Sequence, residues 1–405
     1  MSDDPLRVVL CWHMHQPEYR DPATATFVEP WLLLHALKDY TDMAAHLERV
    51  PAARAVVNFS PLVLDQLEAL VGQLDGCLDG GAPPDEPLLA ALVPGGEPAD
   101  PAARRALLET CLRAHPIHML ARHRPLARLA SLARAVIERP GAEAWLHERF
   151  LADLVGWYVL AWLGESVPAE DSRAARLRTC EQGLGEHDRR ELLAVVRDTL
   201  AGLVPRWRAL AASGRVELAC NPYAHPILPL LIDFESAREA RPDTTLPAGG
   251  PYPDGGERVQ WHLARARARH AECFGCAPAG CWPSEGAVSD AALDAIAEAG
   301  FAWAATGQQV LRHSLDEDSP PGDGVHRPWR TGAHGLATFF RDDALSDRIG
   351  FVYQDWHAED AVADFVAHLE RIADDPDAGA ARVVPIVLDG ENAWEYYPVN
   401  GWHFI

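Results

Sequence analysis

In RVVLCWHMHQPEYR, residues 7–20, an apolar run leads directly into two histidines. This stretch decides the fold because the run indicates a buried strand. Residues i and i+2 of a strand face the same side, so a strand that continues this far points His13 and His15 together. An uninterrupted apolar run is typical of a parallel strand covered on both faces. The two imidazoles then lie at the end of a buried strand, where they could face a metal ion, a substrate or the core.

Short apolar or β-branched runs recur along the chain, and turn residues and a helix-like pattern follow most of them. This rhythm predicts a parallel β/α architecture with function on the loops after the strands. About seven such strands favour a closed barrel or a near-barrel. The predicted strands are RVVLCW (7–12), RAVVNFS (54–60), RVELACNP (215–222), AGCWPS (279–284), FAWAAT (301–306), RIGFVY (348–353) and RVVPIVLDGE (382–391).

About 140 residues between the second and third predicted strands have helical periodicity. We expect a helical insertion over about residues 66–210, packed on a barrel that makes residues 1–405 a single catalytic domain. Residues 401–405, GWHFI, start what looks like another helix and then stop. We therefore expect a carboxyl-terminal helical region to be truncated.

Charge and hydropathy exclude several partners. The 405 residues include 36 basic and 59 acidic side chains, a formal net charge of -23. Nucleic acid and anionic membrane surfaces are therefore unfavourable partners. The chain begins MSDDP, without a basic segment before an apolar one, and its longest apolar run is too short for a membrane span. We expect a soluble cytoplasmic protein; its oligomeric state stays open.

Eight scattered cysteines without a secretory signal favour free thiols over disulfides. His270, Cys273, Cys276 and Cys281 have a spacing at which soft ligands can hold zinc. A closed structural site usually has a second pair of ligands, and none follows. Free cysteines are the favoured interpretation, and a metal at this group stays open.

A carboxylate stands at the expected end of the fourth strand. In GCWPSEGAVSD (280–290), Glu285 follows Trp282 and precedes a Gly turn and a helix that begins near Ser289. A barrel enzyme displays catalytic groups at this position. The alternative is that Glu285 only caps the following helix.

VVPIVLDGENAWEYYP (383–398) repeats the arrangement. Asp389 and Glu391 emerge from a buried strand, and Trp394 and Tyr396 follow them. Flat rings cover the apolar faces of sugars, while carboxylates bind hydroxyls and transfer protons, so the segment predicts a sugar site. A solvated turn after an edge strand is the alternative.

Glu285 and Asp389 can face each other only across a closed or strongly curved sheet. Glycoside cleavage requires such a pair, one carboxylate as nucleophile or base and the other as acid. The loop in GRVELACNPYAHP (214–226) adds His225, although a lone histidine in a loop is more often structural. RDDALSD (341–347) adds charged residues, most of which charge pairing on a loop explains.

Five motifs occur in the order and approximate spacing of the conserved regions of glycoside hydrolase family 57. They are HMHQP (13–17), EPWLLLHALKDYTDM (29–43), GRVELACNPYAHPILP (214–229), CWPSEGAVSD (281–290) and VLDGENAWE (387–395). The resemblance covers about residues 8–400. It implies a distorted (β/α)7 TIM-like barrel, retaining chemistry on α-glucosidic bonds, and catalysis without a metal or other cofactor.

The resemblance also implies roles for single residues. Glu285 resembles the nucleophile of the family, and Asp389 resembles its acid/base. His13 and His15 resemble the histidines that contact the sugar in the cleavage subsite.

Further residues match the wall of the site in this resemblance. Trp282 and Glu391 are at site-lining positions. We expect Trp282, Trp394 and Tyr396 to stack on glucose units, and His225 and Glu391 to bind hydroxyls.

The expected substrate is an α-glucan or a maltooligosaccharide. An α-amylase-like hydrolase and a 4-α-glucanotransferase share the same covalent intermediate, and the sequence does not separate them. A zinc-dependent polysaccharide deacetylase or α-mannosidase-like hydrolase would use His13 and His15 as ligands, but no second closely spaced pair follows. A glucan-binding protein without turnover would not need both Glu285 and Asp389.

Overall fold

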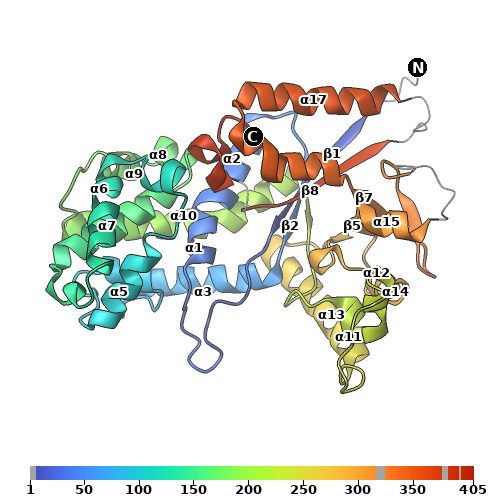
Figure 1. Cartoon of the computed structure of the whole chain (residues 1–405), viewed down its shortest axis with the longest axis horizontal. Helices are drawn as coiled ribbons and strands as arrows, with labels where there is room; N and C mark the ends of the chain where they lie inside the picture. Colours follow the sequence, from blue (N-terminus) through green and yellow to red (C-terminus); the bar gives the residue numbers. More distant parts are fainter. Residues whose placement is uncertain (1–5, 316–323, 376–381, 392–393) are drawn as a thin grey trace.

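The computed structural model describes residues 6–315, 324–375, 382–391 and 394–405, and within them seven parallel strands form the centre of the protein, with helices around them (Figure 1). The strands are β1 (Arg7–Met14), β2 (Ala55–Phe59), β3 (Val216–Ala219), β4 (Gly280–Cys281), β5 (Trp303–Gly307), β7 (Leu336–Arg341) and β8 (Val383–Asp389). A further short strand, β6 (Trp329–Thr331), pairs antiparallel with β7.

The strands are ordered β8-β1-β2-β3 in one run and β4-β5-β7 in the other. Cys220 and Cys281 join the runs on one side through a parallel bridge between the ends of β3 and β4. The main-chain N–H of Cys220 donates to the oxygen of Gly280 at 3.2 Å, and that of Trp282 donates to the oxygen of Cys220 at 3.1 Å.

The runs also meet on the other side, between β7 and β8. The main-chain N–H of Asp342 donates to the oxygen of Pro385 at 2.8 Å. Arg341 Nε donates to the oxygen of Val387 at 2.9 Å, so a side chain replaces part of the ladder here. The seven strands therefore return on themselves, and the predicted α/β fold, a distorted TIM-like barrel, is confirmed.

One predicted strand is wrong. Residues 348–353, RIGFVY, form the π-helical turn η6 (Arg348–Val352) and the start of η7 (Tyr353–Asp355). Ile349 and Tyr353 are buried, and their spacing of four residues suits one face of a helical turn. The strand lies instead in LATFFR, the sequence of β7, which alternates between buried and half-buried residues.

Helices occupy most of the chain between the strands. Those between β1 and β2 are α1 (Trp31–His35), the π-helical turn η1 (Ala36–Tyr40) and α2 (Thr41–Arg49). Those between β2 and β3 are α3 (Pro61–Leu78), α4 (Pro87–Leu92), α5 (Pro101–Thr110), η2 (Pro116–Leu120), α6 (Arg124–Ile137), η3 (Ala142–Trp145), α7 (Glu148–Trp162), α8 (Ser166–Glu170), α9 (Ser172–Leu177) and α10 (Glu186–Ala212).

The described helices after β3, besides η6 and η7, include two long ones, and the others have at most nine residues. They are α11 (Leu228–Ile232), η4 (Phe234–Ser236), α12 (Ala237–Ala240), α13 (Gly255–Phe274), η5 (Ser284–Gly286), α14 (Asp290–Glu298), α15 (Gln308–Ser314), α16 (Asp343–Asp347), α17 (Ala358–Asp374), η9 (Trp394–Tyr396) and η10 (Pro398–Gly401). Among the described helices, none combines the length and apolar character needed to cross a membrane.

Several apolar clusters hold the architecture together, and two of them include residues of both β1 and β8. Cys11, Trp282, Ala305 and Val387 come from different strands around the ring and pack together, so they fill its interior. A much larger cluster joins β1, β2 and β8 to α1–α10, the helices that gather on one side of the barrel in Figure 1. The helical side of the protein therefore shares one core with the strands that carry the site.

Phe59 and Trp207 are at the contact between β2 and α10. Their ring centroids lie 5.8 Å apart, and both side chains are fully buried. We expect Trp207→Ala to lower the free energy of unfolding by about 3–5 kcal/mol, because it removes a large buried ring and leaves a cavity. Urea unfolding measures this loss. The control is Trp145→Ala, which removes a 90 % exposed ring and should change stability by less than about 0.5 kcal/mol; equal stability of both variants would contradict the assigned core.

Candidate active site

The register of three parallel strands brings polar side chains to one level at the barrel mouth. His13 on β1 pairs with Asn58 on β2 and with Asp389 on β8. His13 Nδ1 donates to Asn58 Oδ1 at 2.8 Å. Among the described residues, His13 Nε2 is buried without a hydrogen-bond partner, which leaves it as an acceptor beside Asp389.

His13, His15 and His225 form a stack of three imidazoles. The ring centroids of His15 and His225 lie 3.8 Å apart, and that of His13 lies 5.1 Å from His225 and 5.3 Å from His15. Burial lowers the pKa of His15 to about 3 and of His225 to about 4, and it lowers the pKa of His13 well below its ordinary value. All three rings are therefore neutral at pH 7 and can donate and accept hydrogen bonds.

His225 ties Glu285 to this imidazole stack. Asn221 Nδ2 donates to the main-chain oxygen of Pro222 at 2.9 Å, and because a carbonyl only accepts, this bond fixes the orientation of the amide. The same Nδ2 lies 3.0 Å from His225 Nδ1, so Nδ1 accepts. The ring proton is then on Nε2, which donates to Glu285 Oε1 at 3.2 Å.

Both partners of this bond have strained backbones. Glu285 and His225 each have a φ of 55°, a left-handed conformation that costs a non-glycine residue about 1–3 kcal/mol and is concentrated at functional sites. Glu285 does not cap the next helix, since Ser289 Oγ accepts the N–H of Ala292 at the start of α14. The Glu285 side chain is 77 % exposed, so its carboxylate is open to a ligand.

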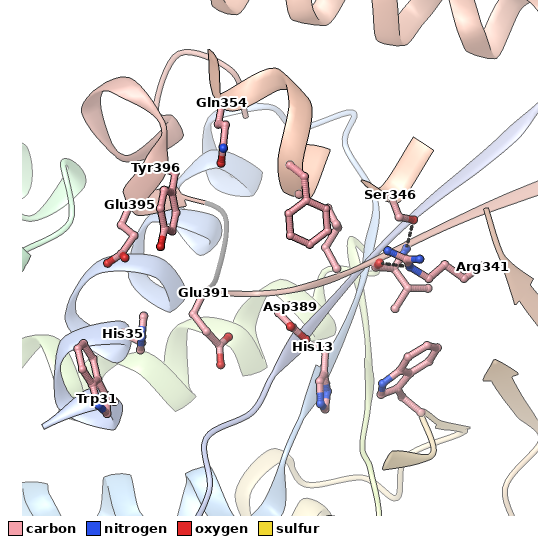
Figure 2. A pocket seen from close by; sticks show the side chains of 15 residues that line it. His13, Trp31, His35, Arg341, Ser346, Gln354, Asp389, Glu391, Glu395 and Tyr396 are labelled. Atoms are coloured by element: carbon pink, nitrogen blue, oxygen red, sulfur yellow. Dashed lines mark hydrogen bonds between the residues drawn. The ribbon is translucent and has the colours of Figure 1, made fainter. Parts of the chain in front are cut away.

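A cavity of about 570 Å³ opens beside His13 and Asp389 (Figure 2). This volume is in the range of small-ligand sites. Trp282, Glu391 and Tyr396 also line it, and the ring of Trp282 lies 6.4 Å from that of His13. Glu285, His15 and His225 are not among its lining residues; the imidazole stack connects them to His13, which does line it.

Glu391 is a buried acid within this cavity. Its Oε1 accepts hydrogen bonds from Gln16 Nε2 at 2.6 Å and from the Tyr40 hydroxyl at 3.2 Å. Its Oε2 has no hydrogen-bond partner in the described part of the chain. Burial first, and then the charge of Asp389, raises the pKa of Glu391 well above its ordinary value. This shift favours the protonated carboxyl, whose proton lies on Oε2 because two donors occupy Oε1.

Trp394 does not reach the cavity, contrary to the expectation that it stacks on glucose. It is 3 % exposed and packs against Tyr397 and Phe404, with ring centroids 5.5 and 6.4 Å away. Its Nε1 donates to the oxygen of Gly390 at 2.9 Å. A ring enclosed in this way has no face left for a sugar. Tyr396, the other aromatic residue of this segment, is 46 % exposed and does line the cavity.

Sequence analysis did not single out several residues of the site, among them four in motifs that it recognised. Trp31 and His35, at i and i+4 of EPWLLLHALKDYTDM, line the cavity from α1. Gln16 of HMHQP and Tyr40 hold Glu391. The i, i+4 spacing of Trp31 and His35 indicates a shared helix face, but only tertiary structure decides what that face meets.

The cysteine and histidine group near α13 is not gathered into a metal site in the described residues. His270 Nδ1 is bonded to the main-chain oxygen of Cys276, Cys276 is exposed, and Cys281 lies buried in β4. Within these ranges, the group of three or more potential metal ligands is instead the imidazole stack, whose candidate ligand atoms lie within 4.8 Å of one another.

We expect Glu391→Gln to gain stability relative to the unmodified protein as the pH rises. A glutamic acid whose folded-state pKa exceeds its ordinary value of 4.5 keeps a proton that the unfolded chain loses. Its contribution to stability therefore falls as the pH rises above about 4.5, whereas glutamine does not ionise. Urea unfolding at about pH 4.5 and about pH 8 measures the change. The exposed Glu370→Gln is the control, and a pH-independent difference for Glu391→Gln would contradict a protonated Glu391.

The fold is similar to that of several solved enzymes. The chain superposes on an α-amylase from Thermotoga maritima with a TM-score of 0.52 at 13 % identity, covering 100 % of this chain and 71 % of that one. A branching enzyme from Thermococcus kodakaraensis gives 0.53 at 13 % identity, covering 98 % and 67 %. A branching enzyme from Pyrococcus horikoshii gives 0.50 at 13 % identity, covering 98 % and 66 %.

Identities this low show the fold alone, and no curated protein is similar enough in sequence to match. The family model for glycosyl hydrolase family 57, however, matches residues 9–405. This match spans nearly the whole chain and includes every residue of the candidate site and all of the barrel strands except the first two residues of β1. The chain therefore belongs to glycosyl hydrolase family 57.

Proposed function

We propose that the protein is a retaining glycoside hydrolase that cleaves α-glucosidic bonds in α-glucans or maltooligosaccharides. The observation that carries this proposal is that Glu285, in the turn after β4, and Asp389, on β8, border one stack of neutral imidazoles. Glu285 bonds to His225, and Asp389 is in register with His13. Membership of family 57 supports a glycosidic bond as the bond that reacts. The α-amylase and branching enzymes among the solved relatives support an α-glucan as substrate.

The proposed reaction has two displacements. Glu285 attacks the anomeric carbon while Asp389 gives its proton to the leaving glycosidic oxygen, so the carbon–oxygen bond breaks and a glycosyl-enzyme forms. His225 holds Glu285 Oε1, which leaves Oε2 as the attacking atom. Asp389 then takes a proton from water, the water oxygen bonds to the anomeric carbon, and Glu285 is released.

Neutral groups bind the sugar in this proposal. His13 and His15 offer ring nitrogens that are buried and have no partner among the described residues. Glu391 donates from Oε2 to a sugar oxygen, while Trp282 and Tyr396 cover apolar sugar faces. Uncharged donors and acceptors suit an uncharged ligand, because neither side has to lose the hydration of an ion.

Transfer to a sugar hydroxyl is the second candidate, since water and an acceptor sugar attack the same intermediate. The branching enzymes among the solved relatives support it. Product analysis on maltooligosaccharides of a single length separates the two activities. Hydrolysis yields only shorter chains, whereas transfer also yields longer ones.

Glu285→Gln tests the nucleophile. We expect turnover of maltoheptaose to fall at least about a thousandfold, because the amide cannot form the glycosyl-enzyme. Release of reducing ends measures turnover, and circular dichroism checks that the variant folds. Glu370→Gln, a change at an exposed carboxylate on α17, should retain full turnover. Undiminished activity of Glu285→Gln would refute its role, and absence of turnover by the unmodified protein on every α-glucan would favour a glucan-binding protein.

A metal-dependent hydrolase is the alternative that the three histidines favour. Against it, both ring nitrogens of His225 are already in hydrogen bonds. We therefore expect full activity after dialysis against a chelator, and we expect His13→Ala to weaken turnover without changing metal content in elemental analysis. About one bound metal ion per chain, with activity lost to the chelator and restored by zinc, would replace the proposed mechanism.

A further inference from the structure

The cavity extends beyond the proposed cleavage site. Figure 2 shows Trp31 and His35 at the end opposite Arg341, with Glu391 between them and Asp389. The two-displacement reaction involves only the part of the cavity near Asp389. The end formed by α1 therefore has no role in the proposed chemistry.

His35 is held at this end by a buried ion pair. His35 Nδ1 lies 2.7 Å from Asp39 Oδ2, and Lys38 Nζ bonds to the other oxygen of Asp39. Lys38 is 0 % exposed and Asp39 is 3 % exposed. Because a carboxylate only accepts, Nδ1 of His35 donates this bond. Nε2, on the ring edge away from Asp39, is then the ring nitrogen left for a ligand, in a side chain that lines the cavity.

Stability alone does not explain this ion pair. The desolvation of a buried lysine and aspartate is seldom outweighed by their mutual attraction. Both residues lie in the π-helical turn η1, a rare geometry that occurs frequently at functional sites. Since the second oxygen of Asp39 is bonded to a residue of the cavity wall, orienting His35 is the task that accounts for the pair.

Aromatic rings fix the surroundings of His35. Trp162 from α7 meets the His35 ring edge-on with centroids 5.5 Å apart, and Lys38 Nζ lies 5.2 Å from the Trp162 centroid. Trp31 lies 6.0 Å from His35 at an interplanar angle of 30°, and the guanidinium of Arg113 covers the Trp31 ring at 4.6 Å. His35 and Trp31 are thus held in place in the absence of a ligand.

We propose that His35 and Trp31 form a binding subsite for a further glucose unit of the same glucan chain, with Asp39 as the positioning residue. His35 Nε2 forms a hydrogen bond with a sugar hydroxyl, which can donate or accept, and Trp31 covers an apolar sugar face. This inference rests on the proposed function and deepens it. It requires a substrate long enough to reach from Asp389 to α1.

Length-resolved binding tests the subsite. Glu285→Gln, which binds without cleaving, is titrated by calorimetry with maltose and each longer maltooligosaccharide up to maltoheptaose. We expect affinity to rise about tenfold at the added unit that reaches His35, from one hydrogen bond and one ring contact. Adding His35→Phe keeps a ring against Trp162 but removes the ring nitrogen that bonds the hydroxyl. This increase in affinity, called the step, should then fall below about threefold, with the affinity for shorter chains unchanged.

A second variant tests the positioning role of Asp39. Asp39→Asn alone would leave Lys38 buried without a counter-charge, so Lys38→Met/Asp39→Asn removes both charges together. We expect this double change to abolish the same step as His35→Phe while short chains bind normally. A merely structural role would instead weaken binding at every length. His313→Phe, at an exposed histidine on α15, is the matched control and should leave the step unchanged.

The outcomes separate the subsite from the proposed function. Equal weakening at all lengths, or an undiminished step in His35→Phe, overturns the subsite. Binding that does not depend on chain length in Glu285→Gln also overturns the subsite, while the proposed function stands. Absence of binding at every length overturns both.

Discussion

The pairing of β1 with β2 on one side and with β8 on the other is the constraint on which the site depends. It sets His13, Asn58 and Asp389 at one level, although Asn58 and Asp389 are 331 positions apart in the sequence. A slip of one residue would turn every side chain of β1 to the opposite face. The main-chain N–H of Gly390 also donates to the oxygen of His13 at 2.8 Å, which continues the pairing to the loop that carries Glu391. A side chain at Gly390 would meet the sulfur of Met14 at 2.3 Å, so glycine permits this close approach.

Four ionisable groups of the site favour their uncharged forms, although the protein has a formal net charge of -23. Burial lowers the pKa values of the three stacked histidines and raises the pKa of Glu391, and both directions favour the uncharged form at neutral pH. The titratable groups named around Glu391 are all acids and come from several elements: Asp389 on β8, Asp39 and Tyr40 on η1, and Glu395 on η9. Desolvation, rather than any single ion pair, is the largest cause of each shift. The three histidines and Glu391 therefore present dipoles, rather than charges, to a ligand.

Several features of the site would cost free energy if they were considered without their surroundings. Glu285 and His225 have left-handed backbones, and Lys38 and Asp39 are a buried ion pair. Such features persist only where the surroundings hold them in place. Here the large core that joins β1, β2 and β8 to α1–α10 supplies this support, with Phe59 and Trp207 at its contact with β2. The hydrogen bond from Asn221 to the oxygen of Pro222 gives the same kind of support to His225.

The sequence by itself determined the α/β class, six of the seven barrel strands and the start of the helix at Ser289, because hydrophobic period, turn residues and caps act over a few neighbouring positions. It indicated the family as well, through five motifs in the expected order. It also indicated that Glu285 and Asp389 follow buried strands. It could not separate RIGFVY from LATFFR as a strand, since a short apolar run fits a helical turn equally well. Only the tertiary structure decided that Trp394 is enclosed by Tyr397 and Phe404, that His225 holds Glu285, and that His35 borders the cavity. Each of these depends on contacts between distant segments, which exist only once the ring of strands has closed and the core has expelled water.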